Sequence, residues 1–147
     1  FLSSILGAMG SGVPMGVAAA MRDPKRQVVI FVGDGGILMT GNELATARLN
    51  NVNPIIILSD NDNYSTINMH HHVRYPGHVD ERATVLKNPD FVKWAEAFGA
   101  KGFLITEESE IDPVFKKAFA VKGQPVLVHV RSSSIQMSAW RRKPAAA

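Results

Sequence analysis

The sequence predicts a doubly wound α/β fold, with a mainly parallel sheet and helices on both faces. Four apolar, β-branched runs alternate with helical patterns along the 147-residue chain. The links between them are short, as in folds where a crossover helix joins parallel strands. The runs are continuous rather than alternating, which is typical of strands that are covered on both faces.

The strands and helices of this fold can be placed along the chain. We expect strands at residues 28–32, 54–58, 102–105 and 126–130. We expect helices at residues 13–21, 40–49, 89–98 and 109–121. Asp23-Pro24 ends the first helix. Asn88 is expected to cap the third, with Pro89 at its first position and Gly99 after its end.

The long segment from Asp60 to Asn88 carries little regular pattern, and it begins at the end of an expected strand. Ligands of open α/β sheets bind outside the carboxyl ends of the strands. Long irregular segments at such positions often carry function. We therefore expect the functional site at this edge of the sheet.

Composition narrows the class of protein. With 46% hydrophobic and 20% charged residues, the chain has the composition of a globular domain, which we place at residues 1–131. No apolar run approaches the roughly 20 residues of a membrane span. The absence of cysteine excludes disulfides, thiolate metal sites and cysteine nucleophiles, and it suits a cytoplasmic protein. We interpret the basic residues 141–143 as part of a solvated tail, residues 132–147, rather than a nucleic-acid site.

The first strand end of chemical interest reads Gly33-Asp34-Gly35-Gly36. Glycines allow backbone N–H groups to approach an anion such as a phosphate closely. A lone carboxylate would repel that phosphate, unless a divalent cation binds both groups. Magnesium is typically held in this way, by one or two protein oxygens together with substrate phosphates.

The second strand end reads Asp60-Asn61-Asp62-Asn63. It offers carboxylate, amide and backbone carbonyl oxygens, which are hard ligands suited to magnesium or calcium. If the two strands are neighbours in a parallel sheet, both clusters meet at the same edge. Together they predict a site for a metal ion and a diphosphate.

The spacing of these clusters resembles the thiamine-diphosphate motif. That motif is Gly-Asp-Gly, here residues 33–35, followed by a spacer, here the 24 residues 36–59, and a pair of asparagines, here Asp60-Asn61. Residues 7–14, 41–47 and 88–99 are similar to the acetolactate synthase and 2-oxo-acid decarboxylase group. Two positions depart from the pattern, because Asp60 replaces the first asparagine and Asn63 stands where glycine is common.

The resemblance implies a role for each matched residue. The side chains of Asp34 and Asn61 and the backbone carbonyl of Asn63 would bind Mg²⁺, together with two diphosphate oxygens and a water. The residues that would contact thiamine diphosphate are Ala8 and Met9 near its aminopyrimidine ring, and Gly33, Gly35 and Gly36 at its diphosphate. The implied activity is decarboxylation of a 2-oxo acid, with or without carboligation, and an acetolactate-synthase-like parent is preferred.

The resemblance also implies a missing partner. Enzymes of this family activate the cofactor with a glutamate on a separate pyrimidine-binding domain, usually on another subunit, so no catalytic residue can be assigned in this chain. We expect a homo-oligomer, a dimer or tetramer, that neither binds nucleic acid nor enters a membrane. The chain begins at Phe1 rather than methionine, which favours a fragment of a longer enzyme over one chain of a split enzyme. Alone, it is expected to be inactive and to bind the cofactor poorly.

Two other functions compete with this interpretation. Gly10, Gly12 and Gly16 resemble a loosened dinucleotide fingerprint, with residues 1–6 as its strand and Asp34 as the acid that binds a ribose. However, Pro14 interrupts the loop, and nothing in that hypothesis explains the second cluster. The other alternative is a scaffold domain that keeps the fold without the chemistry, which has no need of two metal ligands at this spacing.

Three consecutive histidines, His70, His71 and His72, raise the question of a zinc site. Side chains of three successive residues do not easily converge on one ion. His78 is the only nearby histidine that could join them. We therefore predict that the histidines belong to a solvated or pocket-lining loop.

Overall fold

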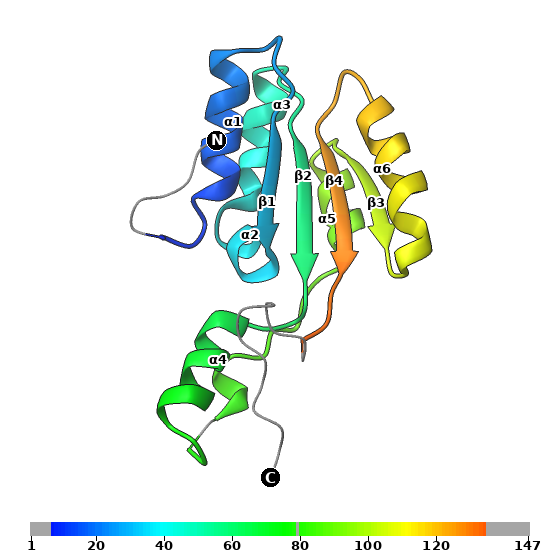
Figure 1. Cartoon of the computed structure of the whole chain (residues 1–147). Helices are drawn as coiled ribbons and strands as arrows, with labels where there is room; N and C mark the ends of the chain where they lie inside the picture. The colour runs from blue at the N-terminus through cyan, green and yellow to red at the C-terminus, as the bar shows by residue number, and fades with distance from the viewer. Residues whose placement is uncertain (1–6, 79, 135–147) are drawn as a thin grey trace.

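The computed structural model of the chain describes residues 7–78 and 80–134 (Figure 1). Its centre is a four-stranded sheet in which every neighbouring pair is parallel. In spatial order the strands are β1 (Val29–Gly33), β2 (Ile55–Asp60), β4 (Val126–Arg131) and β3 (Lys101–Ile105). The prediction of a parallel α/β sheet is therefore confirmed.

Six α-helices lie among the described residues: α1 (Gly12–Arg22), α2 (Asp34–Thr40), α3 (Leu44–Leu49), α4 (Ser65–Arg74), α5 (Phe91–Ala97) and α6 (Ile111–Ala120). Three short 3₁₀ turns accompany them: η1 (Gly41–Glu43), η2 (Glu81–Ala83) and η3 (Glu108–Glu110). None of the described helices is long and apolar enough to cross a membrane.

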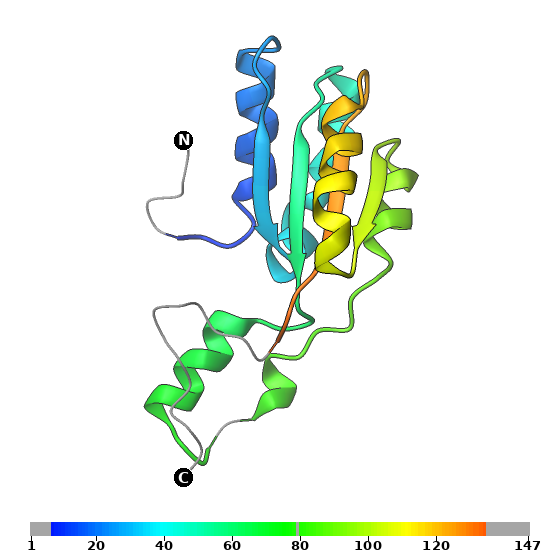
Figure 2. The ribbon, with the colours of Figure 1, turned by 45° about the vertical axis from the view of Figure 1, so that its right-hand side comes forward.

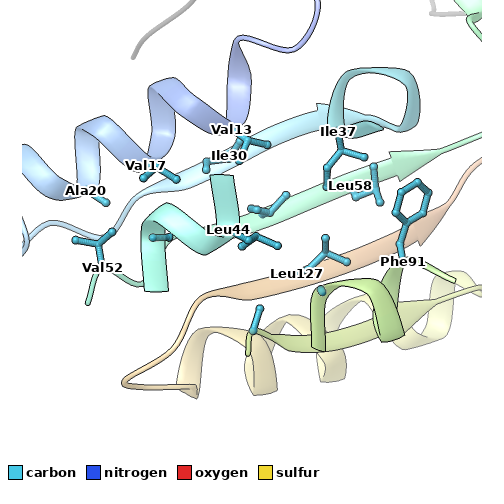
Figure 3. Close-up of a cluster of buried hydrophobic side chains, with 14 residues drawn as sticks. Val13, Val17, Ala20, Ile30, Ile37, Leu44, Val52, Leu58, Phe91 and Leu127 are labelled. Carbon is cyan, nitrogen blue, oxygen red and sulfur yellow. The ribbon is translucent and has the colours of Figure 1, made fainter. Parts of the chain in front are cut away.

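Helices cover both faces of the sheet. The larger core joins α1, α2, α3 and α5 to one face, and Figure 3 shows Val17, Leu44 and Phe91 directed toward the sheet. The smaller core lies on the other face, where α6 packs over β3 and β4 (Figure 2). Alternate strand residues enter the two cores, which is the period of two that a strand requires.

On the face of the sheet that α6 covers, strand β1 is less buried than expected. Here α6 packs mainly against β3 and β4, whereas β1 is the strand at the opposite edge of the sheet. Consequently Phe31, in the middle of β1, is 76% exposed, whereas its neighbour Ile30 is 4% exposed in the larger core. The expectation that the first strand is covered on both faces is therefore wrong for Phe31 within the described part of the chain.

Close approach of α1 to β1 depends on one glycine. A Cβ atom added to Gly16 would lie 2.3 Å from Cδ1 of Ile30, far inside van der Waals contact. Gly16 therefore has a packing role in the structure, which accounts for a residue that also fits the dinucleotide fingerprint. The strand that this hypothesis expects, residues 1–6, lies outside the described residues.

Three elements near the functional edge differ from their expected bounds. The helix expected at residues 40–49 is shorter, with η1 followed by α3, and a separate helix that was not predicted, α2, comes directly after β1. A ten-residue helix, α4, occupies part of the segment that was expected to be irregular, and it carries the three histidines. The prediction missed α4 because the helix buries no residue, so its sequence carries no apolar stripe.

The third difference concerns the start of α5. Asp90, rather than Asn88, is the cap, because its side chain accepts a hydrogen bond from the backbone N–H of Lys93 at 3.1 Å. The helix begins at Phe91. The side chain of Asn88 instead donates hydrogen bonds to Asp34 and Asp60.

The segment that enters α4 pairs with the segment that leaves it. Backbone N–H groups of Tyr64 and Leu86 donate to the carbonyls of Thr84 and Asp62, each at 2.8 Å. Figures 1 and 2 both show α4 beyond the carboxyl ends of the strands, away from the body of the sheet. The expected domain end at residue 131 coincides with the last residue of β4, and the tail after residue 134 lies outside the described residues.

Candidate functional site

The two predicted clusters meet at the carboxyl edge of the sheet. Strands β1 and β2 are parallel neighbours in a register that pairs Gly33 with Ser59. Their carboxyl ends therefore lie side by side, with Asp34 just beyond one strand and Asn63 beyond the other. The backbone N–H of Asn63 donates to Oδ2 of Asp34 at 3.3 Å. Residues 29 positions apart in sequence thus share one site.

Asp34 is buried and held by N–H donors. Its side chain accepts from the backbone N–H of Gly35 at 2.9 Å and from the side-chain amide of Asn88 at 2.9 Å, in addition to Asn63. Burial raises the pKa of the Asp34 carboxyl above its ordinary value. The hydrogen bonds from Asn88 and Gly35 oppose that rise, whereas the nearby Asp60 adds to it.

Asp60 is more deeply enclosed, and four donors surround it. Oδ1 accepts from the backbone N–H of Asp62 at 3.1 Å and from Asn88 at 2.7 Å. Oδ2 lies 2.7 Å from Nε2 of His129 and accepts from Arg131 at 2.6 Å. Burial alone would raise the pKa of Asp60, but these four interactions together hold it below its ordinary value.

Arg131 ties the second cluster to β4. The register of the two strands places Arg131 beside Asp60, and its guanidinium also forms an ion pair with Asp62. Both carboxylates keep the pKa of Arg131 above its ordinary range. Since all oxygens of Asp60 are engaged inside the protein, this extra carboxylate is not presented to a ligand.

Asn61 and Asn63 bracket the turn into α4. The amide of Asn61 donates to Oγ of Ser65 at 2.7 Å, which orients the side chain. The backbone carbonyl of Asn63 accepts from the N–H of Ser65 at 2.8 Å and, more weakly, from the Ser65 hydroxyl at 3.5 Å. Oδ1 of Asn63 is buried without a hydrogen-bond partner. Such an atom indicates a polar group still to be bound.

A groove of about 960 Å³ runs along β1, from Arg26 before the strand to the carboxyl edge of the sheet. Its lining includes all eight residues that the sequence implicated in cofactor binding: Ala8, Met9, Gly33, Asp34, Gly35, Gly36, Asn61 and Asn63. The segment that carries Ala8 and Met9 is tied to α2, because Oγ1 of Thr40 donates to the carbonyl of Gly10. The structure therefore brings together every residue of the predicted site.

The narrowest part of this groove requires a glycine. A Cβ atom on Gly35 would lie 2.3 Å from Cε1 of Tyr64 and 3.1 Å from the terminal methyl of Met9. Gly35 is therefore packed between two side chains, and its backbone N–H donates to the carboxylate of Asp34. The contact of this glycine segment with a diphosphate stays a prediction.

Sequence reasoning missed Asn88, His129 and Arg131. Asn88 looked like a helix cap because a proline follows it. His129 and Arg131 lie on β4, whose neighbours in the sheet cannot be read from chain order. The sequence did contain one signal for a polar role at this position, because a histidine and an arginine stand at the end of an otherwise apolar strand.

The histidines of α4 form no metal centre. Among the described residues there is no group of three or more His, Cys, Asp or Glu side chains placed to hold an ion. His72 lies 3.9 Å from Glu81 and belongs to a helix rather than the predicted loop. The groove lining does not include His70, His71 or His72.

Comparison with known proteins places this geometry in a family. Residues 1–130 match the thiamine pyrophosphate enzyme family, in its C-terminal TPP binding domain. The chain belongs to this family. It is thus a thiamine pyrophosphate-binding domain, and the resemblance seen in its motif is confirmed.

Individual relatives agree with the family. YdaP of Bacillus subtilis, named as a thiamine pyrophosphate-containing protein, is 36% identical over 129 residues, 88% of this chain and 22% of that protein. The mitochondrial acetolactate synthase of Schizosaccharomyces pombe is 33% identical over 85% of this chain and 18% of its own length. The large subunit of acetolactate synthase isozyme 2 of Escherichia coli is 31% identical over 97% of this chain and 25% of its own length. The chain thus spans about a fifth to a quarter of these relatives.

The residues of the domain fit the family's cofactor. The groove offers backbone N–H groups at a glycine cradle beside a buried carboxylate, which suits an anionic diphosphate only if a cation accompanies it. The carboxylate of Asp34 and the backbone of Asn63, whose N–H contacts that carboxylate, lie together at that point. The site is therefore chemically matched to a diphosphate with a hard divalent ion.

Proposed function

We propose that this domain anchors thiamine diphosphate through a magnesium ion, in an enzyme that decarboxylates 2-oxo acids with or without carboligation. The observation that carries the proposal is the contact between the N–H of Asn63 and the carboxylate of Asp34. It joins the two halves of the motif at one edge of a groove. Acetolactate synthases among the relatives support an acetolactate-synthase-like reaction.

The magnesium ion would be held by the carboxylate of Asp34, the amide oxygen of Asn61 and the backbone carbonyl of Asn63. All three are hard oxygen donors, as this ion prefers. A single carboxylate is enough, because magnesium retains water and takes further oxygens from the phosphates it accompanies. This agrees with the lack of a three-residue acidic or histidine cluster in the described part of the chain.

The rest of the groove would position the organic part of the cofactor. Gly33, Gly35 and Gly36 would offer backbone contacts to the diphosphate, and Ala8 and Met9 would lie by the aminopyrimidine ring. When bound, thiamine diphosphate supplies the nucleophilic carbon and the electron sink for the chemistry at the 2-oxo acid. The protein would bind and orient the cofactor and exclude competing reactions.

The activating glutamate would come from a pyrimidine-binding domain of the same or another subunit. We therefore place the domain in a longer enzyme that forms a homo-oligomer, either a dimer or a tetramer, in the cytoplasm. The isolated chain would contain the metal ligands but no catalytic acid or base. It would be inactive toward 2-oxo acids and would bind the cofactor weakly.

Titration of the chain with thiamine diphosphate, followed by heteronuclear NMR, tests this proposal, because NMR detects millimolar binding. With Mg²⁺ present, we expect saturable shifts at the amides of Gly35 and Asn63. Asp34→Ala and Asn61→Ala should remove the dependence on Mg²⁺.

Asn68→Ala is the matched control, because the amide of Asn68 bonds Thr84 rather than a proposed ligand. It should leave the Mg²⁺-dependent shifts in place. Binding that is equal with and without Mg²⁺, or equal in the wild type and Asp34→Ala, would refute the metal-anchored site.

A further inference from the structure

Asn88 connects the two acidic residues of the site. Its side-chain amide donates to Oδ2 of Asp34 at 2.9 Å and to Oδ1 of Asp60 at 2.7 Å. Asp34 lies 54 positions earlier in the chain and Asp60 lies 28 positions earlier. One NH₂ group thus links Asp60, the last residue of β2, to Asp34, the first residue after β1.

The orientation of this amide is set by its partners. Both neighbours of Nδ2 are carboxylate oxygens, which only accept hydrogen bonds. A rotated amide would place its own oxygen against both of them, so the NH₂ group must face the carboxylates. Oδ1 of Asn88 then points away and is buried with no hydrogen-bond partner.

The two carboxylates differ in how their charge is balanced. Asp60 has a guanidinium from Arg131 and a ring nitrogen of His129 against it. Asp34 forms no ion pair with any Lys, Arg or His side chain that the structure describes; its donors are uncharged N–H groups. Its negative charge is therefore left for a cation from outside the chain.

The position of Asn88 is enforced by the elements on either side. Pro89 restricts Asn88 to an extended backbone. Immediately afterwards α5 begins, and the ring of Phe91, fully buried, packs edge-on against His129 with centroids 5.4 Å apart. The start of α5 is thereby fastened to the same cluster that surrounds Asp60.

We infer that Asn88 is a positioning residue for the metal-binding carboxylate. Its NH₂ group holds Asp34 at a set distance from Asp60. Because this donor is uncharged, the negative charge of Asp34 remains available to the metal ion. This inference rests on the proposed magnesium role of Asp34. Asn88 is not among the residues that line the groove.

Loss of this amide has a defined consequence. Asp34 would keep the backbone N–H groups of Gly35 and Asn63 but lose its only side-chain donor. The two buried carboxylates would then face each other with no donor between them, and Asp34 would be free to turn from its binding geometry. Partners that orient a metal ligand from behind typically change metal affinity by about 10- to 100-fold when they are removed.

The test is Mn²⁺ binding to the chain in the presence of saturating thiamine diphosphate, followed by electron paramagnetic resonance. Four proteins are compared: the wild type, Asp34→Ala, Asn88→Ala and Asn68→Ala. Asn68 is again the control, because it is a partly buried asparagine whose amide donates to the hydroxyl of Thr84 at 3.0 Å. All are measured well below their melting temperatures.

We expect Asn88→Ala to weaken Mn²⁺ binding about 10- to 100-fold and Asn68→Ala to leave it unchanged. Asn88→Ser, which keeps one donor, should fall between the wild type and Asn88→Ala. If Asn88→Ala does not fold, the Mn²⁺ affinity of Asn88→Ser tests the inference in its place. A purely structural role for Asn88 would lower the melting temperature without changing Mn²⁺ affinity in the folded variants, and that result would overturn the inference.

The comparison with Asp34→Ala separates the two proposals. If Asp34→Ala binds Mn²⁺ as the wild type does, the proposed metal site fails and this inference fails with it. If Asp34→Ala loses binding while Asn88→Ala and Asn88→Ser keep it, only the role of Asn88 is refuted. Side-chain amide NMR in the wild type gives a further check, since Mg²⁺ with the cofactor should shift the two Asn88 NH₂ protons.

Discussion

Arg131 donates to the buried carboxylate of Asp60 at 2.6 Å, across two neighbouring parallel strands. The side chain of Asp60 is 1% exposed and that of Arg131 is 40% exposed, so the pair joins the interior to the surface at the carboxyl edge of the sheet. It neutralises the carboxylate that stands where the thiamine-diphosphate motif has its first asparagine. The extra charge is thus balanced inside the protein.

Arg131→Met should destabilise the domain by about 1–3 kcal/mol, because a buried charged acceptor loses one of its donors. His129 and Asn88 remain beside Asp60 and limit the loss. Urea unfolding followed by circular dichroism measures the change in the free energy of unfolding.

Arg82→Met is the matched control for this change. Arg82 pairs with Asp80, but both side chains are largely exposed, so no measurable loss of stability is expected. Equal stabilities of the two variants would show that the Arg131 pair does not support the fold.

Gly35→Ala should be destabilising by about 1–3 kcal/mol, because the added methyl group has to displace the ring of Tyr64. Gly33→Ala provides a control, since the nearest atom to its added Cβ is the carbonyl oxygen of Ser59 at 4.0 Å. Thermal melting of both variants measures the difference. A melting temperature of Gly35→Ala as high as that of Gly33→Ala would contradict the close contact at Tyr64.

Asp60 predicts an acid-dependent contribution to stability. Its pKa is lower in the folded chain than its ordinary value of 3.8. The folded state therefore favours the ionised form, so this contribution is complete above about pH 4 and is lost as the pH falls through the lower folded value. We expect the stability difference between the wild type and Asp60→Asn to be largest near neutral pH and to shrink below pH 4.

Urea unfolding of both proteins at several pH values between 3 and 7 measures this difference. The raised pKa of Asp34 changes the pH dependence of stability in the opposite direction. The effect of Asp60 is therefore taken from the difference between the wild type and Asp60→Asn at each pH, and not from the profile of one protein. A difference that is constant across the series would show that the donors around Asp60 do not favour its charged form.

Neighbouring residues on β1 should respond differently to truncation. Ile30→Ala removes a side chain from the larger core and should cost about 2–5 kcal/mol. Phe31→Ala, at a side chain that is 76% exposed, should change the stability of the chain by less than about 0.5 kcal/mol. Denaturant midpoints of the two variants test this directly. A large loss at Phe31 would mean that its ring is covered in solution.

Local patterns in the sequence were enough for the elements of the sheet and for most of the site. Each apolar run forms a strand because most of its residues are buried between the sheet and the helices. The motif residues lie together because β1 ends at Gly33 and β2 ends at Asp60, and the carboxyl ends of parallel neighbours share an edge. The groove accordingly contains all the residues that the motif implicated.

The helix α4 shows why some local structure could not be predicted. It buries none of its residues, so its sequence has no hydrophobic period. Its position depends instead on backbone pairing between the segments that leave and re-enter the sheet, as at Tyr64 and Thr84. Pairing between distant segments leaves little trace in composition.

The amino-acid sequence is sufficient to predict the fold class, the approximate strand positions and the Gly-Asp-Gly and Asp-Asn clusters. The pairing of Arg131 with Asp60, and the link that Asn88 forms between Asp60 and Asp34, depend on the tertiary structure. The reason is the strand order β1-β2-β4-β3, in which β2 lies beside the last strand and not beside the next one in the chain. Hydrogen-bond partners of buried polar side chains depend on which strands become neighbours, and chain order alone does not contain that information.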